Sequence, residues 1–172
     1  MSSKVLVALR VRAAPERAFD AFVREIGAWW RPNAMFAFTP RAPGVLSFEP
    51  GPSGGVADGR LIETRQSGEG PKVFVIGQVR AWDPPRRLVV GWRHAAFTPD
   101  QDTEVTVIFE PVDGFGGAET RVTVEHRGWD SVPTEHAAKH HWPDPIFLRR
   151  HGEWWQTLLA SYRDALQGDT RA

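Results

Sequence analysis

The sequence contains a regular succession of short segments with strand character, and this feature most limits how the chain can fold. Between residues 35 and 128 each segment ends in a cluster rich in Gly, Pro or Asp. Such clusters form turns and loops, because Gly frees the backbone and Pro fixes it. The predicted strands cover about 44–49, 56–64, 72–82, 87–93, 103–112 and 119–128. Their short connections predict an antiparallel meander.

The predicted strands alternate apolar and polar residues, as expected for a sheet that is covered on one face. A first strand over residues 4–12 alternates in the same way. The later strands place the following side chains on one inner face: Leu88, Val90, Trp92, Val105, Val107, Phe109, Val122, Val124 and His126. An apolar layer is therefore expected to lie against that face.

The C-terminal segment can supply this layer. Apolar residues recur at helical spacing over about 18 residues, from His151 to Gly168. A shorter amphipathic helix is expected to begin at Pro15, because proline suits the first turn of a helix. One long helix packed across a curved antiparallel sheet is the simplest closure, so we predict an α+β fold. The stretch 129–145 is then the longest irregular connection.

Composition limits the classes of function. The chain has 21 Lys plus Arg and 21 Asp plus Glu, so its net charge is zero and a nucleic-acid partner is not expected. The length of 172 residues and the hydrophobic content of 41% predict one globular domain over residues 1–172. Because Cys is absent, disulfides and cysteine-bound metals are excluded. The apolar run after Lys4 is too short for a signal peptide or a membrane span, so we expect a cytoplasmic protein.

Several stretches of the chain have the order and spacing of a known superfamily. They are GRLIET, GQVRAWDPPRRLVVGWR, TEVTVIFEPV, TRVTVEHRGWD and the terminal HGEWWQTLLASYRDAL. The most specific residues form a strand-turn-strand signature: Gly77, Val79, Trp82, Pro84, Pro85, Leu88 and Trp92. Together with APERAFDAF after the first strand, these stretches resemble the SRPBCC (START-like) superfamily, in the branch named after the activator of the heat-shock protein 90 ATPase. The resemblance covers nearly the whole chain.

The resemblance implies a helix-grip fold, in which a curved antiparallel sheet wraps around a long C-terminal helix and encloses a cavity. Members of the superfamily bind lipids, hormones, polyketides or other apolar ligands, and some catalyse reactions in the cavity. The superfamily has no universal set of catalytic residues, so none is carried over to this chain. The loop PGPSGGVADG and the His-rich segment 133–145 depart from plain members of the branch. Both are expected to reshape the mouth of the cavity.

Aromatic side chains are the candidate ligand contacts, because large rings from sheet and helix can line a pocket. Strand and helix periodicity direct Trp92, Phe109, Trp154 and Trp155 inward, so we expect them to form the cavity walls. The full set of predicted contacts is Trp30, Phe38, Phe48, Trp92, Phe109, His126, Trp129, Phe147, Trp154, Trp155 and Leu158. We therefore predict binding of a small apolar molecule, either lipid-like, aromatic or polyketide-like, without a cofactor.

Two other functions stay open at this point. His126 on the inner face could act as an acid or base near neutral pH, or it could be a core histidine with satisfied hydrogen bonds. With Glu63 as its partner, His126 would serve a cavity enzyme such as a cyclase, dehydratase or hydrolase; an outward salt bridge is the simpler role for Glu63. The third function is that of a chaperone-associated or stress-response protein, which would bind its partner through the outer sheet face or the long loop. The oligomeric state is not predicted.

Two further patterns match chemical motifs only formally. His136 and His140 are four residues apart, which on a helix would place both on one face as metal ligands. Prolines flank them closely and the HExxH arrangement is absent, so no metal site is predicted. Gly51, Ser53 and Gly55 match the G-x-S-x-G nucleophile elbow, but a strand rather than a helix is expected to follow. A serine hydrolase is not predicted.

Overall fold

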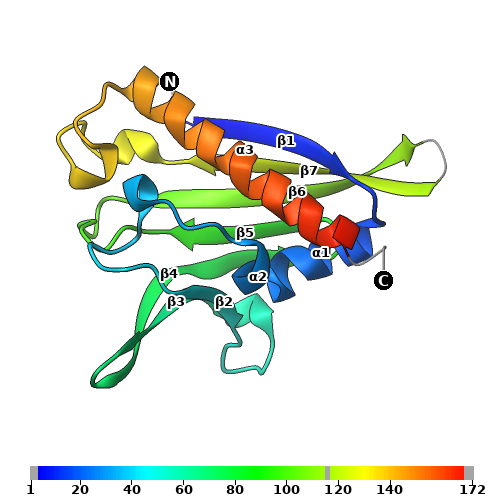
Figure 1. The fold of residues 1–172 in the computed structure, drawn as a ribbon, viewed down its shortest axis with the longest axis horizontal. Coiled ribbons are helices and arrows are strands. Elements are labelled where there is room, and N and C mark those ends of the chain that lie inside the picture. The colour runs from blue at the N-terminus through cyan, green and yellow to red at the C-terminus, as the bar shows by residue number, and fades with distance from the viewer. Residues whose placement is uncertain (1–3, 115–116, 169–172) are drawn as a thin grey trace.

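The computed structural model describes residues 4–114 and 117–168, which form a curved antiparallel sheet with a long helix across it (Figure 1). The strand order is β1-β7-β6-β5-β4-β3-β2. The strands are β1 (Lys4–Val11), β2 (Val45–Glu49), β3 (Arg60–Ser67), β4 (Gly70–Asp83), β5 (Arg87–Trp92), β6 (Thr103–Gly114) and β7 (Gly117–Arg127). This architecture confirms the predicted α+β helix-grip fold.

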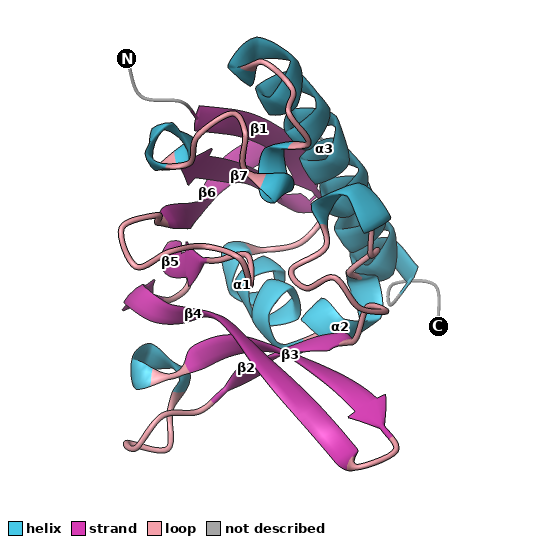
Figure 2. Cartoon of the chain, turned by 90° about the vertical axis from the view of Figure 1, so that its left-hand side faces the viewer, coloured by secondary structure: helices cyan, strands magenta, loops and turns pink. Residues whose placement is uncertain are grey.

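The α-helices lie on the concave side of the sheet (Figure 2). They are α1 (Pro15–Arg24), α2 (Ile26–Trp29) and α3 (Asp144–Gly168). Short 3-10 helices cover Ala34–Phe36, Val56–Asp58, Trp129–Ser131 and Ala137–Lys139. In Figure 1, α3 runs diagonally across β1, β7 and β6, and α1 and α2 lie beside its C-terminal half. No helix within the described ranges is long and apolar enough to cross a membrane.

The predicted inner face of the sheet is buried as expected. One row of paired residues crosses four strands, in which Val90 pairs with Val105, Val105 with His126, and His126 with Val5. Each of these side chains is at most 4% exposed. A polar imidazole in such an apolar row needs hydrogen-bond partners, because an unpaired polar group in the core is costly. The imidazole of His126 must therefore find its hydrogen-bond partners inside the core.

The sheet bends sharply at β4, which pairs with β3 over residues 70–78 and with β5 over residues 79–83. The register shifts once in the β3–β4 pairing and once in the β4–β5 pairing, and such bulges increase the local twist of a sheet. At the bend, a Cβ atom added to Gly77 would lie 1.7 Å from the carbonyl oxygen of Gly91. The close approach of the two backbones therefore requires glycine at this position of the signature.

The predicted strand 56–64 was wrong at its start, because β3 begins only at Arg60. The residues before it form a loop that is held by Asp58, whose carboxylate accepts a hydrogen bond from the Ser53 backbone N–H at 2.9 Å. The same carboxylate accepts from the Ser53 hydroxyl, which lowers the pKa of Asp58. The G-x-S-x-G stretch is therefore a closed loop followed by a 3-10 turn, without the helix of a nucleophile elbow.

The long helix also begins earlier than predicted, at Asp144 instead of His151. Pro145 occupies its first turn, where a backbone N–H would have no partner within the helix, so proline is tolerated there. The additional turns carry Phe147 into the interior, where it is 0% exposed. The irregular connection after β7 is correspondingly shorter.

Candidate functional site

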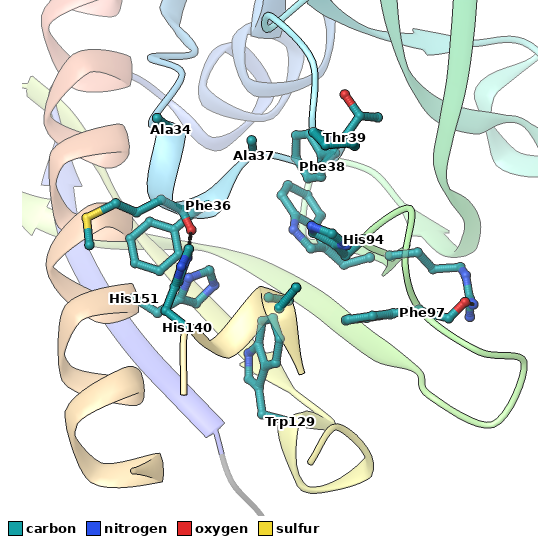
Figure 3. Close-up of a pocket in the computed structure, with 16 residues that line it drawn as sticks. Ala34, Phe36, Ala37, Phe38, Thr39, His94, Phe97, Trp129, His140 and His151 are labelled. Carbon is teal, nitrogen blue, oxygen red and sulfur yellow. Dashed lines mark hydrogen bonds between the residues drawn. The ribbon is translucent and has the colours of Figure 1, made fainter. Parts of the chain in front are cut away.

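The structure contains a pocket at the end of the molecule where β5 ends and α3 begins (Figure 3). We call it the end pocket, and its volume is about 130 Å³. Five segments form its walls: residues 34–40, the end of β5 with the residues that follow it, Trp129, residues 137–140 and His151. The wall includes the rings of Phe36, Phe38, Trp92, Phe97 and Trp129, together with polar groups such as Arg93, His94 and His140. An aromatic lining of this kind suits a flat apolar molecule.

A second hollow lies next to the end pocket and shares Ala34 and residues 36–40 as its wall. This side hollow has a volume of about 390 Å³ and is lined by Trp30, Phe38, Glu63 and Trp154, among others. The ring of Trp30 lies 5.6 Å from that of Trp92, which lines the end pocket. The two spaces are therefore neighbours that are divided by aromatic rings.

Rings from the sheet and from α3 meet between these spaces. Trp92 of β5 lies 5.5 Å from Trp155 of α3, measured between ring centroids. Phe109 of β6 lies apart from this contact and packs against α1, with its ring 5.0 Å from Phe19 and 5.8 Å from Phe22. Helix α1 thus fills the part of the interior that Phe109 faces.

The predicted ligand contacts fall into groups with different surroundings. Phe38, Trp92 and Trp129 line the end pocket, and Trp30, Phe38 and Trp154 line the side hollow. Phe48 lines a separate groove beside α1. The others are at most 1% exposed and belong to the packed core: Phe109, His126, Phe147, Trp155 and Leu158. Open space therefore lies at the end of the sheet and in the groove beside α1, whose volume is about 990 Å³, and the centre is filled with side chains.

Two buried histidines connect the end pocket to the core: His151 belongs to the pocket wall and His126 lies behind it. His151 Nε2 lies 2.9 Å from His126 Nδ1, and the indole N–H of Trp155 donates to the same His126 nitrogen at 3.3 Å. On its other side, His126 Nε2 lies 2.9 Å from the Thr103 hydroxyl oxygen. That hydroxyl donates to the carbonyl oxygen of Trp92 at 2.5 Å. The imidazole of His126 therefore has partners on both ring nitrogens.

The direction of these hydrogen bonds follows from the number of protons available. The Thr103 hydroxyl has one proton and gives it to a carbonyl, so it must accept a proton from His126 Nε2. The neutral His126 ring then carries no proton on Nδ1, and the one lone pair of this nitrogen is shared between the closer donor, His151 Nε2 at 2.9 Å, and the Trp155 indole N–H at 3.3 Å. His151 in turn carries its proton on Nε2, and its Nδ1 is left with a free lone pair. The chain of donors thus ends in an acceptor on His151.

Both histidines are held in the neutral form. Burial lowers the pKa of His151 to about 3. Burial and the neighbouring His151 lower the pKa of His126 well below its usual value of 6.5. An imidazole with such a low pKa is a weak base at neutral pH, which disfavours proton abstraction. As a neutral group, however, it can still accept a hydrogen bond.

Some buried polar atoms have no hydrogen-bond partner, among the residues described. They are His151 Nδ1, Trp129 Nε1 and Trp29 Nε1. The first two belong to residues that line the end pocket, and their ring centroids are 5.2 Å apart. Trp29 instead belongs to the packed core, where its ring contacts Phe22 and Tyr162. One unsatisfied donor and one unsatisfied acceptor therefore lie beside the end pocket, each covered by neighbouring side chains.

Glu63 points inward, contrary to the simpler expectation of an outward salt bridge. It is 5% exposed, and burial raises the pKa of its carboxyl group. It lines the side hollow, whereas His126 lies behind the end pocket. No hydrogen bond or ion pair in the described parts of the chain joins Glu63 to His126. The two residues proposed as an acid/base pair are therefore in different surroundings.

His136 and His140 flank the 3-10 helix Ala137–Lys139 and do not share the face of an α-helix. Their Nε2 atoms are hydrogen-bonded to different backbone carbonyls, those of Ala96 and Met35. Residues 4–114 and 117–168 contain no group of three or more His, Asp or Glu side chains that could hold a metal ion. Both histidines instead connect the loop after β7 to neighbouring segments.

Sequence reasoning did not identify Thr103 and His151 as partners of His126. Two signals were present, because strand parity directs His126 inward and helical spacing directs His151 inward. Neither signal reports how far along the sheet the helix places its side chain. The contact between them therefore required the structure.

Comparisons with known proteins agree with this fold. The family model of Activator of Hsp90 ATPase homolog 1-like protein matches residues 12–146. A search of curated proteins found no match. Among solved structures, a protein of Mesorhizobium loti is similar with a TM-score of 0.61 and 18% identity, covering 97% of this chain and 98% of its own. A structure described as an HSP90 activator from Plasmodium falciparum has a TM-score of 0.57 and 15% identity, covering 96% of both chains. The Aha1 dimer from Colwellia psychrerythraea has a TM-score of 0.55 and 18% identity, covering 95% of both.

Proposed function

This chain belongs to the family of Activator of Hsp90 ATPase homolog 1-like proteins, and on that premise we propose that it binds a small aromatic molecule in the end pocket. The observation that carries the proposal is the ring-lined space at the end of the sheet. Its rings come from separate parts of the chain, including β5, the loop after it and the turn after β7. Rings held by separate elements form a pocket that exists before a ligand arrives.

The volume of the end pocket favours a ligand with one ring. A cavity of about 150 Å³ in another protein is large enough for benzene, and the end pocket has about 130 Å³. Pockets for drug-sized ligands have roughly 300 to 1,000 Å³. Lipid-like and polyketide-like ligands would therefore have to occupy the side hollow as well, whereas a single aromatic ring fits the end pocket alone.

The expected affinity is modest. A single ring that buries about 150 Å² of apolar surface gains about 4 kcal/mol, at about 25 cal/mol per Å². The cost of association offsets part of this gain, so an apolar ring alone should bind with a dissociation constant of about 1 mM or weaker. Tighter binding requires polar contacts. The assay must therefore work at millimolar ligand concentrations.

Titration with toluene, followed by two-dimensional NMR of the ¹⁵N-labelled protein, tests this function. Saturable shifts in residues around the end pocket are expected. In Ala37→Phe the added ring would fill the space and abolish these shifts, since Ala37 lines the pocket (Figure 3). Ala57→Phe, at an exposed position in the loop before β3, is the matched control and should bind as the wild type does. Shifts that are absent, or equal in both variants, would refute binding in the end pocket.

An acid/base enzyme receives less support from this site. The pKa of His151 is about 3, His126 is fully buried, and Glu63 lines the other hollow. A catalytic pair would need both groups within reach of one substrate atom. We therefore rank binding ahead of catalysis.

Association with a protein partner is the second candidate, because two of the similar structures carry the name of an Hsp90 activator or of Aha1. A cytoplasmic location would be consistent with such a partner. The large apolar side chains that are exposed in the described ranges, such as Leu6, Val45, Val73 and Ile108, come from four different strands. Isolated exposed apolar side chains are common on monomers, so they do not define a docking surface. Stimulation of the ATPase of a purified heat-shock protein 90 would test this candidate directly.

A further inference from the structure

We infer that the end pocket recognises a phenol-type ligand, whose hydroxyl accepts a hydrogen bond from Trp129 Nε1–H and donates one to His151 Nδ1. This inference rests on the proposed function and adds the chemical class of the ligand. It starts from the two buried nitrogens of the pocket residues that have no partner in the protein.

The two nitrogens have opposite hydrogen-bonding roles, so a ligand group that pairs with both must accept one hydrogen bond and donate another. The indole nitrogen of Trp129 can only donate. Because His151 gives its proton to His126, its Nδ1 can only accept. A hydroxyl group has one proton to donate and two lone pairs, so it satisfies both nitrogens. A carboxylate, an ether or a ketone has no proton to donate and satisfies only Trp129.

The two groups lie on neighbouring rings of the pocket wall. The ring centroids of Trp129 and His151 are 5.2 Å apart, and both residues line the end pocket (Figure 3). Two hydrogen bonds of about 2.9 Å to one oxygen reach across roughly 5.8 Å, which is the scale of contact between adjacent rings. Neighbouring side chains cover both nitrogens. The half-buried ring of Phe36 lines the pocket and lies 4.9 Å from that of His151, so a shift of this ring is one way for the hydroxyl to reach the nitrogen.

Two other polar side chains of the pocket wall, Arg93 and His140, already have partners. The guanidinium of Arg93 donates to the carbonyl oxygens of Gln101, Phe97 and Thr98. His140 Nε2 is bonded to the carbonyl of Met35. A water molecule would satisfy the hydrogen bonding of the two free nitrogens but would make no apolar contact with the surrounding rings. A hydroxyl carried on an aromatic ring provides both interactions.

The wild-type protein provides the first test, with phenol, anisole and toluene as probes. These molecules share the ring, but anisole lacks the proton and toluene lacks the oxygen. We expect phenol to bind about threefold to tenfold more tightly than anisole, which corresponds to one hydrogen bond. The indole N–H signal of Trp129, assigned by its loss in Trp129→Phe, should move downfield with phenol and not with toluene.

Two variants provide the second test through the ratio of phenol affinity to toluene affinity. The ratio cancels changes in packing that affect both probes equally. Trp129→Phe removes the donor and keeps a ring, so the ratio should fall about threefold to tenfold. Trp29→Phe is the matched control, because it removes an equally unpartnered indole N–H from the core and should leave the ratio unchanged.

The outcomes separate this inference from the proposed function. Equal affinities for phenol, anisole and toluene in the wild type would overturn the hydroxyl contact while leaving an apolar binding site in place. A ratio that falls equally in Trp129→Phe and Trp29→Phe would also overturn it. Failure of all three probes to bind would overturn the proposed function together with the inference.

Discussion

A decrease in pH from 7 to 5 should destabilise the protein through the buried pair His126 and His151. Burial lowers the pKa of His151 to about 3 and the pKa of His126 well below 6.5. In the unfolded chain, both groups regain a pKa of about 6.5. Below pH 6.5 the unfolded state therefore binds more protons than the native state. The free energy of unfolding must then fall as the pH falls, until the pH approaches the native pKa values.

The size of this effect follows from the distance below pH 6.5. For His151 the gap at pH 5 is about 1.5 pH units, and each unit corresponds to about 1.4 kcal/mol. The expected loss is about 2 kcal/mol from His151, and His126 adds to it in the same direction. Glu63 acts in the opposite direction, because burial raises the pKa of its carboxyl group and favours the native state as the pH falls. A variant is therefore needed to isolate the histidine contribution.

Urea unfolding followed by tryptophan fluorescence, at pH 7 and at pH 5, measures this contribution. His151→Gln does not titrate, and its amide N–H can still donate to His126 Nδ1. Between the two pH values this variant should lose about 2 kcal/mol less than the wild type. His141→Gln, at an exposed position, is the control and should follow the wild type. A loss in His151→Gln equal to that of the wild type would refute the neutral, buried state of His151.

Two further substitutions test the packing. Gly77→Ala should cost more than about 2 kcal/mol of unfolding free energy, because its Cβ would lie 1.7 Å from the Gly91 carbonyl oxygen; Gly68→Ala, with open space around the added Cβ, is the control and should cost little in the same urea assay. Tyr162→Phe should cost about 1 kcal/mol, because it removes the hydroxyl that donates to the Ala18 carbonyl and joins α3 to α1. Unchanged stability in that variant would show that the bond contributes nothing.

Much of the fold could be predicted from sequence because its signals are local. Alternation along β5, β6 and β7 identified the inner face, and helical spacing identified α3 as the covering layer. The errors occurred where a residue has two local interpretations. Pro145 was consistent with a loop, yet in the structure it lies in the first turn of α3. Likewise, residues 56–58 have the composition of a strand end but form a turn held by Asp58.

The candidate site was less predictable, because its contacts depend on where the helix crosses the sheet. Parity placed His126 on the inner side and allowed the same for Glu63, for which an outward salt bridge was the simpler expectation, and both are buried. Parity does not tell which inner residues share a space, and these two have different surroundings. The filled centre was also not predictable, since it depends on how α1 packs against Phe109.

The hydrogen-bonding role of His151 is set by the backbone carbonyl of Trp92, to which His151 is connected through Thr103 and His126. The carbonyl oxygen of Trp92 can only accept, so Thr103 must donate to it and must accept from His126. His126 is then an acceptor toward α3, where Trp155 and His151 both donate to it. The proton on Nε2 of His151 leaves its Nδ1 as an acceptor beside the pocket. This acceptor is thus a consequence of the pairing between β5 and β6, which places Thr103 opposite Trp92.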